Sequence, residues 1–490
     1  MSIYIIGAGF AGRTIAKEIL AKGIYGPISA FLDDDPGKIG THIEQAPVLG
    51  PVDDVLDILS LSAKDEALIA MPSAPRERIR EIFAHLKRAG FPRIRILPDV
   101  GQIIEGEAHL VQTRELDLQD LLGRKPLRIG LKQSLGYLKG KRVLISGAGG
   151  SIGSEIARQL LHGGAERLYL LGHGENSIYE IDRELRLLQQ EGVGEEATIV
   201  PVIGELQDPD FTNFIMERLR ADVVFHAAAY KHVPMMEENP VNAIKNNVFG
   251  TLNLLRASRV HGVKRFVLIS TDKAVNPRSI YGASKKIAEA IVLSEGQKTQ
   301  ADFRSMVVRF GNVLGSRGSI IPLFREQIRT GGPVTITHPE VSRFFMTIPE
   351  AVSLVLKAGG VGKNSGLYLL DMGEPVFIRD IAEQLIRFHG FEPHQDIPIR
   401  VIGLRKGEKL TETLTEDFEH ARTTEFPKIL EVQNSLDWTG KGLADFLEQL
   451  YPVCYRSSQQ PEKYRDRKLL RRILASRLPD LPENTDEPQF

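Results

Sequence analysis

The sequence predicts an α/β protein built from two Rossmann-like units, each a doubly wound parallel sheet covered by helices. Short apolar strands alternate with helix-like segments along most of the 490 residues, which is the pattern of a parallel sheet. One glycine-rich loop follows the first strand of the chain, and a second follows a strand that ends at Ser146. A glycine-rich loop between a strand and a helix is typical of dinucleotide binding.

The first unit is expected over residues 1–100. Its first strand, Ser2–Ile6, is followed by the glycines of the first loop, Gly7, Gly9 and Gly12, and by an apolar helix. The later elements are strands at residues 28–32, 67–71 and 94–97 and a helix that begins near residue 76. Asp33 follows the second strand, at the distance where an acid binds a ribose. We expect this unit to bind a nucleotide without chemistry, because no Tyr-x-x-x-Lys follows it.

A polar connector is expected over residues 101–140, with a helix at 117–122, before the second unit at 141–455. The strands of this unit are expected at residues 141–146, 167–171, 198–202, 222–226, 265–270 and 305–309. From about residue 315 the spacing loosens, which indicates a smaller substrate-binding region. Residues 456–490 should form a solvated basic helix over 463–472 and a disordered tail. Binding of that helix to an anionic membrane or a partner is the alternative.

The bulk composition excludes several classes of protein. Lys and Arg number 62 against 63 Asp and Glu, so no basic surface for nucleic acid is expected. Cys454 is the single cysteine, which rules out an intramolecular disulfide and a cysteine metal cluster. No apolar run reaches the length of a membrane span, and the chain opens on a strand without a signal peptide. We therefore expect a cytoplasmic protein.

The second glycine-rich loop predicts a dinucleotide site. Its glycines let the backbone approach a pyrophosphate, and the helix that follows supplies N–H donors. The residues expected here are Gly147, Gly150, Ser151, Ile152 and Gly153. The acid that binds the adenosine ribose in NAD enzymes is missing at Gly172, although His173 and Glu175 follow. NAD and NADP therefore both remain open, and Glu205 and Leu206, after the third strand, are expected beside the adenine.

The stretch after the fourth strand carries small residues that allow close approach to the cofactor: Ala227, Ala228 and Ala229. Lys231 and His232, next in the chain, are expected to face the substrate. His226 and His232 lack carboxylate partners at a suitable spacing, so no metal is expected. Asn247, on the following helix, should tie the chain together beneath the site and contact the cofactor; an amide on the helix surface is the alternative.

The run from Ser270 to Lys285 predicts the catalytic centre. Tyr281 and Lys285 are four residues apart and share one face of a helix. An ammonium beside a phenol favours the phenolate, so Tyr281 is expected to accept a proton near neutral pH. Asp272 and Lys273 add an acid and a base at the carboxyl end of a strand, where open parallel sheets bind ligands.

A polar loop after the sixth strand could clamp a nucleotide diphosphate through backbone N–H groups and Asn312. Charged residues of the same region add to this expected substrate site, because guanidinium and ammonium groups bind phosphates. They are Arg317, Arg343, Arg405 and Glu408.

Taken together, these segments resemble the polysaccharide-biosynthesis nucleoside-diphosphate-sugar 4,6-dehydratases of the extended short-chain dehydrogenase/reductase superfamily. The matching stretches are residues 147–153, 226–237, 270–277, 309–316 and 403–409. The resemblance covers roughly residues 122–450, and the first unit resembles the domain that precedes the catalytic domain in the large membrane-anchored members. Three departures are the missing membrane helices, Tyr281, where many large members carry methionine, and Lys406, where the family motif has proline.

The resemblance implies a redox cycle on UDP-N-acetylglucosamine without net oxidation. Tyr281, assisted by Lys285, removes the C4 hydroxyl proton while hydride moves from C4 to the nicotinamide. Lys273 then takes the C5 proton and Asp272 protonates the departing C6 hydroxyl, before hydride returns to C6. Thr271 hydrogen-bonds the C4 oxygen. The alternatives are a UDP-sugar 4-epimerase with the same Tyr–Lys pair and a non-catalytic nucleotide-sugar sensor. We also expect a homo-oligomer.

Overall fold

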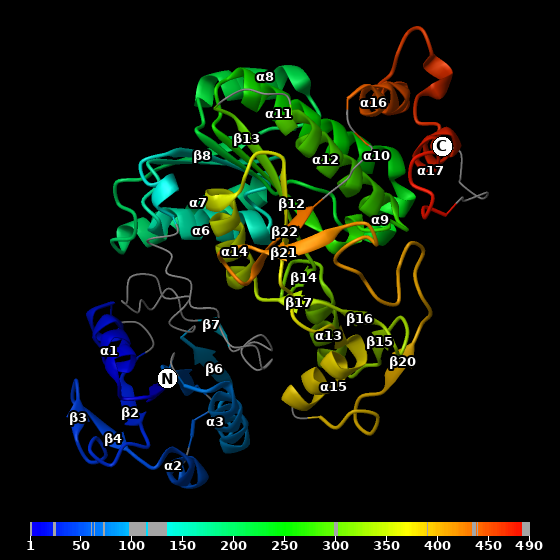
Figure 1. Cartoon of the computed structure of the whole chain (residues 1–490). Coiled ribbons are helices and arrows are strands. Elements are labelled where there is room, and N and C mark those ends of the chain that lie inside the picture. The colour runs from blue at the N-terminus through cyan, green and yellow to red at the C-terminus, as the bar shows by residue number, and fades with distance from the viewer. Residues whose placement is uncertain are drawn as a thin grey trace. The chain divides into compact units, whose positions relative to one another are not determined.

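The computed structural model describes residues 2–22, 26–59, 61–62, 64–71, 74–97, 114–115, 135–297, 302–389, 391–433, 438 and 440–482. The chain forms two compact units, Met1–Ile129 with Gln384–Asp396 and Gly130–Glu383 with Ile397–Phe490. Both are α/β units with largely parallel sheets, as the sequence predicts (Figure 1). The helix expected at 117–122, most of the expected connector and the residues after 482 lie outside the described part of the chain.

The first unit is a sheet whose described strands lie in the order β3-β4-β2-β1-β5-β6-β7. Strands β4, β2, β1, β5 and β6 are parallel, and the antiparallel pairs β3–β4 and β6–β7 lie at the two edges. The bounds are β1 Ile3–Ile6, α1 Phe10–Lys22, β2 Ile28–Leu32, β3 His42–Ile43, β4 Ala46–Leu49, α2 Val52–Ile58, β5 Glu66–Ile69, α3 Arg76–Ala89, β6 Arg93–Ile96 and β7 Arg114–Glu115. The four strands and the two longer helices expected from the sequence are confirmed.

The second unit contains a larger sheet, whose described strands lie in the order β10-β9-β8-β11-β12-β13-β18-β22-β21. The first seven run parallel, and β22 and β21 extend the sheet as antiparallel strands. Their bounds are β8 Arg142–Ser146, β9 Arg167–Gly172, β10 Thr198–Ile203, β11 Val223–His226, β12 Arg265–Thr271, β13 Arg304–Phe310, β18 Gly366–Leu370, β21 His420–Thr423 and β22 Ile429–Gln433. The strand order reverses between β8 and β11, so ligands are expected at the carboxyl ends of these strands.

Helices cover both faces of this sheet (Figure 1). One face carries α6 (Ser151–His162), α7 (Glu175–Gln190) and α14 (Ile348–Val361). The other carries α8 (Pro209–Leu219), α11 (Gly250–Val260) and α12 (Ile280–Gln297). With helices on both faces, the strands are buried on both sides, which explains why they read as continuous apolar runs.

Helix α12 lies inside the unit rather than on its surface. All but its last residue are buried, and its apolar side chains belong to the main core of the unit. A helix buried on every side cannot show a clear amphipathic pattern. Its sequence mixes apolar, small and charged residues, and each buried charge must therefore find a partner inside the protein.

The smaller part of the second unit follows β13 as a series of short elements, as expected from about residue 315. They are β14 Asn312–Val313, α13 Ile320–Arg329, β15 Val334–Ile336, β16 Ser342–Arg343, β17 Phe345–Met346, β19 Val376–Phe377, α15 Ile378–Phe388 and β20 Ile399–Val401. Only the part of α15 up to Glu383 belongs to this unit. The pairing of β14 with β17 starts directly after the sheet. Because of this pairing, Asn312 is held close to the carboxyl end of β12.

The basic stretch near the C-terminus corrects one prediction. It forms the helix α17, Arg467–Ala475, as expected. The helix is not simply solvated, since Arg467, Arg471, Leu470 and Leu474 are buried. Its apolar residues join the main core together with those of α16, Lys441–Cys454, on which α17 packs. The positive charges at positions 467 and 471 therefore face the protein interior.

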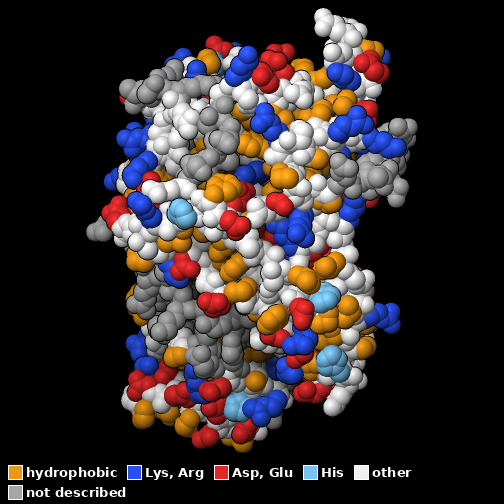
Figure 2. All heavy atoms as spheres, turned by 45° about the vertical axis from the view of Figure 1, so that its right-hand side comes forward, with side chains coloured by type: hydrophobic (Ala, Val, Ile, Leu, Met, Phe, Trp, Pro, Cys, Tyr) orange, Lys and Arg blue, Asp and Glu red, His pale blue; other side chains and the backbone are white. Residues whose placement is uncertain are grey.

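The visible surface fits the balanced composition. Acidic and basic side chains are interspersed over the face in Figure 2, without a large area of one sign. In the described residues no helix is both long and apolar enough to cross a bilayer.

Candidate active site

The glycine-rich loop between β8 and α6 has the geometry of a phosphate-binding turn. Gly147 adopts a φ of +70°, and a Cβ there would lie 2.7 Å from the backbone of Ala228. A Cβ on Gly153 would overlap the carbonyl oxygen of Gly147, so this glycine is needed for helix and strand to pack closely. Gly150 caps α6, whose first residues are Ser151 and Ile152. The N-terminus of α6 therefore points its free N–H groups out of the sheet edge.

The residues expected around the adenosine lie along the neighbouring strand ends. His173 and Glu175 follow β9 and are exposed, and Glu175 opens α7. Glu205 is exposed after β10, whereas Leu206 is 7% exposed and packs into the core. Leu206 thus contributes an apolar wall rather than a polar contact.

Asn247 ties two parts of the site together. It is 1% exposed and lies in a π-helical turn, Lys245–Phe249. Its side chain exchanges two 2.9 Å hydrogen bonds with the backbone of Tyr230 and donates a third, also 2.9 Å, to Ser284 of α12. The expected structural tie is present, and the alternative of a surface amide is wrong. Asn247 fixes the loop that carries Ala227, Ala228 and Ala229 against the helix of Tyr281.

His226 is a structural residue. It is 1% exposed, and its ring bonds Ser146 at 2.6 Å and Thr251 at 2.8 Å. Burial, with a smaller effect of the nearby Lys285 charge, lowers the pKa of His226 to about 3. It is therefore neutral at physiological pH. In the described part of the chain, no group of three His, Cys, Asp or Glu side chains is arranged to hold a metal ion.

Thr271, Asp272 and Lys273 form a hydrogen-bonded group at the carboxyl end of β12. Asp272 is fully buried, and its Oδ1 accepts hydrogen bonds of 2.9 Å from both the Thr271 hydroxyl and the Lys273 ammonium. Its second oxygen, Oδ2, is buried without a hydrogen-bond partner. The Lys273 ammonium also donates to Asn312 at 2.9 Å. The Asp272 carboxylate is thus enclosed by the protein, whereas the Lys273 side chain is 20% exposed.

Lys273 is a cation in this structure. Burial alone lowers its pKa, but the carboxylates of Asp272 and Glu412 outweigh that effect, and the net pKa is raised. Lys273 is thus protonated in the protein without ligands, and its expected role as the C5 base stays a prediction. To accept a proton from a substrate it must first pass its own proton on, and Asp272 is the nearest acceptor.

Tyr281 and Lys285 lie in the first turns of α12, as expected. Burial raises the pKa of Tyr281 to about 12, and the opposing effect of the Lys273 charge does not cancel it. The expected phenolate near neutral pH is therefore wrong for the protein without ligands. Burial also lowers the pKa of Lys285 to about 8. Among the described residues its ammonium has no hydrogen-bond acceptor, so it is available to a ligand hydroxyl.

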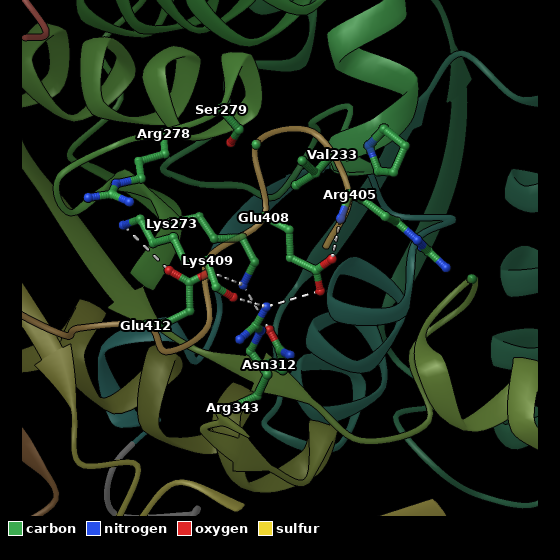
Figure 3. Close-up of a pocket in the computed structure, with 13 residues that line it drawn as sticks. Val233, Lys273, Arg278, Ser279, Asn312, Arg343, Arg405, Glu408, Lys409 and Glu412 are labelled. Atoms are coloured by element: carbon green, nitrogen blue, oxygen red, sulfur yellow. Dashed lines mark hydrogen bonds and ion pairs between the residues drawn. The ribbon is translucent and has the colours of Figure 1, made fainter. Parts of the chain in front are cut away.

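A pocket of about 240 Å³ opens beside this group. Its lining joins Lys273 and Asn312 to residues from two later loops. Figure 3 shows Lys273, Lys409 and Glu412 together on one side of the pocket, with Asn312 and Arg343 beside them. The other lining residues are Val233, Pro234, Arg278, Ser279, Gly318, Arg405, Gly407 and Glu408. Cations outnumber carboxylates in this lining, which suits an anionic ligand.

Arg343 and Glu408 organise the pocket wall. Arg343 is 6% exposed and donates to three backbone carbonyls, those of Ser342, Lys409 and Leu410, at 2.8–2.9 Å. Glu408 accepts from the Thr337 hydroxyl and from the backbone N–H of Arg405. Both side chains are therefore largely used in shaping the loop, while the Arg405 side chain is exposed and extends away from Lys273, Lys409 and Glu412 (Figure 3).

The remaining expected substrate residues lie at the rim or beyond it. Lys231 reaches Ser316 at 3.5 Å, and burial together with the Lys273 charge lowers its pKa. The His232 ring packs where a Cβ on Gly318 would lie. Arg317 contacts Gly149 and Ser151 of the glycine-rich loop and pairs with Glu180 at 2.7 Å. Arg317 is thus placed at the expected cofactor loop and not in the pocket.

Glu412 is a site residue that the sequence analysis missed. Its side chain is 4% exposed, and its oxygens lie 3.8 Å from the Lys273 ammonium and 3.6 Å from that of Lys409. Its Oε2 is buried and pairs with the Lys409 ammonium. No sequence pattern marked Glu412, because it lies three residues after Lys409 in a loop without periodicity.

A buried network of charged residues lies next to the carboxyl ends of β12 and β13. The Arg309 guanidinium, fully buried, bonds Glu289 of α12 and Glu419, both at 2.7 Å. Ser270 also donates to Glu289. Burial raises the pKa of Glu289, but the Arg309 charge and hydrogen bonds prevail and lower it. The network joins β12, β13 and α12 one residue before Thr271.

The Rossmann-type fold and the residues at its strand ends agree with the resemblance to a polysaccharide-biosynthesis family. The family model described as "Polysaccharide biosynthesis protein" matches residues 143–434, and the chain belongs to that family. "Probable polysaccharide biosynthesis protein EpsC" of Bacillus subtilis is 41% identical over 450 residues, 92% of this chain and 74% of the relative. The crystal structure of Pen from Bacillus thuringiensis is 33% identical, with a TM-score of 0.56 over 61% of this chain and 91% of that one.

Relatives at lower identity carry two different activities in their names. A "UDP-N-acetylglucosamine 4,6-dehydratase (inverting)" of Campylobacter jejuni is 31% identical over 344 residues, 68% of this chain and 96% of the relative. A "UDP-glucose 4-epimerase" of Rickettsia bellii is 31% identical over 291 residues, 58% of this chain and 80% of the relative. The protein therefore belongs to a polysaccharide-biosynthesis family of nucleotide-sugar dehydratases and epimerases.

Proposed function

We propose that the protein is an NAD(P)-dependent 4,6-dehydratase that converts UDP-N-acetylglucosamine to a UDP-4-keto-6-deoxy-N-acetylhexosamine. The observation that carries the proposal is the Asp272–Lys273 pair, buried within the same hydrogen-bonded group as Thr271 and directly beside the pocket. A 4-epimerase needs a tyrosine that removes and returns one hydroxyl proton. Loss of water additionally needs an acid and a base, and this pair supplies both.

The site suits a dinucleotide at the carboxyl ends of β8 and β11. The glycine-rich loop, the N-terminus of α6 and the Lys285 ammonium, which has no acceptor among the described residues, are the groups that would hold the pyrophosphate and the nicotinamide ribose. Bound NAD or NADP supplies the acceptor that takes hydride from the sugar and returns it. Exposed Glu175 could bind a ribose hydroxyl and favour NAD, whereas Gly172 leaves room for NADP.

The protons can be balanced within the protein. Tyr281 must first lose its own phenolic proton, which a Lys285 ammonium at the same site favours by stabilising the phenolate, and the phenolate then accepts the C4 hydroxyl proton. Lys273 passes its proton across the 2.9 Å contact to Asp272, which leaves a neutral amine for the C5 proton and an acid for the departing C6 hydroxyl. Asp272 supplies the proton on the water that leaves, and Lys273 returns the C5 proton when hydride adds to C6. The O4 proton held by Tyr281 then replaces the one that Lys273 gave to Asp272, so the net loss is the C6 hydroxyl and the O4 proton.

The pocket supports the choice of a nucleoside diphosphate sugar. Arg405, Lys409 and Arg278 line it together with Lys273, and such cations bind phosphate oxygens. Glu412, which also lines the pocket, offers carboxylate oxygens to sugar hydroxyls. The N-acetylglucosamine part of the proposal comes from the dehydratase relative, and its use in surface glycan synthesis comes from the family.

The decisive experiment is a reaction of the purified protein with UDP-N-acetylglucosamine and added NAD or NADP, followed by mass spectrometry. We expect a product lighter by one water and no net reduced cofactor. Formation of UDP-N-acetylgalactosamine without loss of water would identify an epimerase. Stoichiometric reduced cofactor would identify a simple dehydrogenase, and binding without turnover would favour a sensor.

A further inference from the structure

Glu237, in the short helix α9 (Val233–Glu238), contacts two distant parts of the second unit. Its side chain is 3% exposed. Oε1 accepts a 2.7 Å hydrogen bond from the backbone N–H of Ile280, the first residue of α12. Oε2 accepts a 2.7 Å bond from Arg471 of α17. One carboxylate thus joins the start of the helix that carries Tyr281 to a helix near the C-terminus.

The contact with Ile280 adds to the cap of α12, in which the Ser279 hydroxyl already accepts from the backbone N–H of Gly282. The first N–H groups of a helix lack partners within the helix, and Ile280 is fully buried, so water cannot supply one. A carboxylate at a helix N-terminus is also favoured by the helix dipole. Glu237 therefore fixes the start of α12 one residue before Tyr281.

The contact with Arg471 makes this cap possible. A buried carboxylate without a cation is strongly unfavourable, and Arg471, with a 5% exposed side chain, supplies the charge. Arg467, one turn earlier on α17, donates to the backbone carbonyl of Glu237 at 3.2 Å. Both arginines lie outside residues 143–434, the segment that matches the family model.

The same carboxylate also lies under the pocket wall. Gly407 adopts a φ of +75°, and a Cβ there would lie 3.3 Å from Oε1 of Glu237 and 2.8 Å from the side chain of Ser279. Both Gly407 and Ser279 line the pocket. A shift of Glu237 would thus reach the start of α12 and the loop of Arg405 and Lys409 together.

We propose that Arg471 and Glu237 are positioning residues for the reaction: the ion pair holds the cap of α12, and the cap sets the place of Tyr281. Helix α17 then affects the position of Tyr281, although none of its residues lines the pocket. The proposal rests on the proposed function only for its activity measurement, because the movement of α12 can be measured without any substrate.

The test compares three full-length variants. Arg471→Met leaves Glu237 buried without its cation, so we expect kcat to fall by about 10²-fold, the size expected for a small misplacement of a catalytic group, with a smaller change in KM. Glu237→Gln with Arg471→Met should restore kcat to within a few-fold of the original protein, because a glutamine oxygen can still accept from Ile280 and carries no charge. Arg472→Met, an exposed arginine on the same helix, is the matched control and should change nothing.

Hydrogen–deuterium exchange gives the second measurement. In Arg471→Met the peptide covering residues 278–284 should exchange faster, while the peptide of α6 should not. If Arg471→Met fails to fold, the variant that combines Glu237→Gln with Arg471→Met tests the inference by itself, because it should fold and retain activity. Normal kcat and normal exchange in Arg471→Met, or a double variant as impaired as the single one, would overturn the inference. If the original protein does not dehydrate UDP-N-acetylglucosamine, the proposed function is wrong. The hydrogen–deuterium exchange result still tests whether Arg471 and Glu237 position α12.

Discussion

Lys273 and Glu412 face each other across 3.8 Å between Nζ and Oε1, although one ends the central sheet and the other lies in a loop of the smaller region. Glu412 helps Asp272 to hold Lys273 as a cation in spite of its burial. The contact thus connects the loop that carries Lys409 and Glu412 to the proposed acid–base pair. The Glu412 charge raises the pKa of Lys273 and so makes the loss of its proton harder.

Replacing Glu412 should therefore change the titration of Lys273. Glu412→Gln keeps the shape of the side chain and removes its charge, so the pKa of Lys273 should fall. The neutral amine reacts with acetic anhydride, and we expect Lys273 to be acetylated faster at a given pH, as measured by peptide mass spectrometry. Glu408→Gln is the control, because that carboxylate contacts Arg343 and Thr337 instead. Equal labelling of Lys273 in both variants would show that Glu412 does not act on it.

The two halves of the proposed reaction should separate in two variants. Tyr281→Phe should block oxidation at C4, so neither reduced cofactor nor product appears. Asp272→Asn should permit oxidation and block the loss of water, so reduced cofactor and the 4-keto sugar accumulate. Loss of one proton-transfer group typically costs about 10²–10⁴-fold in rate. Near-normal turnover of Asp272→Asn would remove the basis for a dehydratase.

The pKa of Lys285 predicts the alkaline limb of the pH profile. At about 8, the group is an ammonium below that pH and loses its proton above it. Since the ammonium stabilises charge on the Tyr281 oxygen, kcat/KM, which reports on the free enzyme, should fall above about pH 8. In Lys285→Arg the rate will be lower, but the limb should move to higher pH. An unchanged limb in that variant would assign it to another group.

The buried network around Arg309 predicts a large effect on stability. Arg309→Met leaves Glu289 and Glu419 buried without their cation, so the free energy of unfolding should fall by about 3–5 kcal/mol. Arg317→Met is the control, because the 63% exposed Arg317 side chain makes a surface pair, and such pairs contribute only about 0–1 kcal/mol. Urea unfolding measures both. Similar losses in the two variants would contradict the role assigned to the network.

The first unit allows a test of its expected nucleotide site. A Cβ added to Gly9 would have no described atom within 4 Å, whereas a Cβ on Gly12 would overlap the carbonyl oxygen of Gly7. Gly9→Val should therefore fold normally and remove one nucleotide-binding site from the full chain, as counted by calorimetry. Gly12→Val should disrupt the unit itself. Unchanged stoichiometry in Gly9→Val would mean that these glycines only shape a turn.

The contacts of Asp33 do not favour its expected role in binding a ribose. Its carboxylate accepts from the backbone of Ala8 at 2.6 Å and of Asp35 at 2.9 Å, and it also pairs with Lys38. The side chain expected to bind a ribose is thus already used in holding the glycine-rich loop. A ligand would have to compete with these contacts.

The strands and the Asp272–Lys273–Tyr281 group could be predicted because both depend on local sequence. Buried parallel strands read as short apolar runs, and polar residues at their carboxyl ends meet at one sheet edge. Glu412 could not be placed in this way, since it comes from a loop without periodicity. The raised pKa of Tyr281 was also out of reach, because it depends on how completely the tertiary structure buries the phenol.

The interpretation of α17 failed for a different reason. Basic composition suggested a solvated helix, yet Arg467 and Arg471 are four residues apart and share a face with the apolar Leu470 and Leu474. That spacing was visible in the sequence and indicates one packed face. What could not be foreseen was the buried carboxylate of Glu237 that receives the charge.

The complete burial of α12 limits how this protein can diversify. A helix with a solvent face offers positions where substitutions are neutral, but nearly every side chain of α12 fills space in the core, so most changes there would displace Tyr281 and Lys285 together. The loop with Arg405 and Lys409 has no such constraint on its exposed residues. In directed evolution toward other sugar nucleotides, the active variants should therefore carry substitutions in that loop and none in α12.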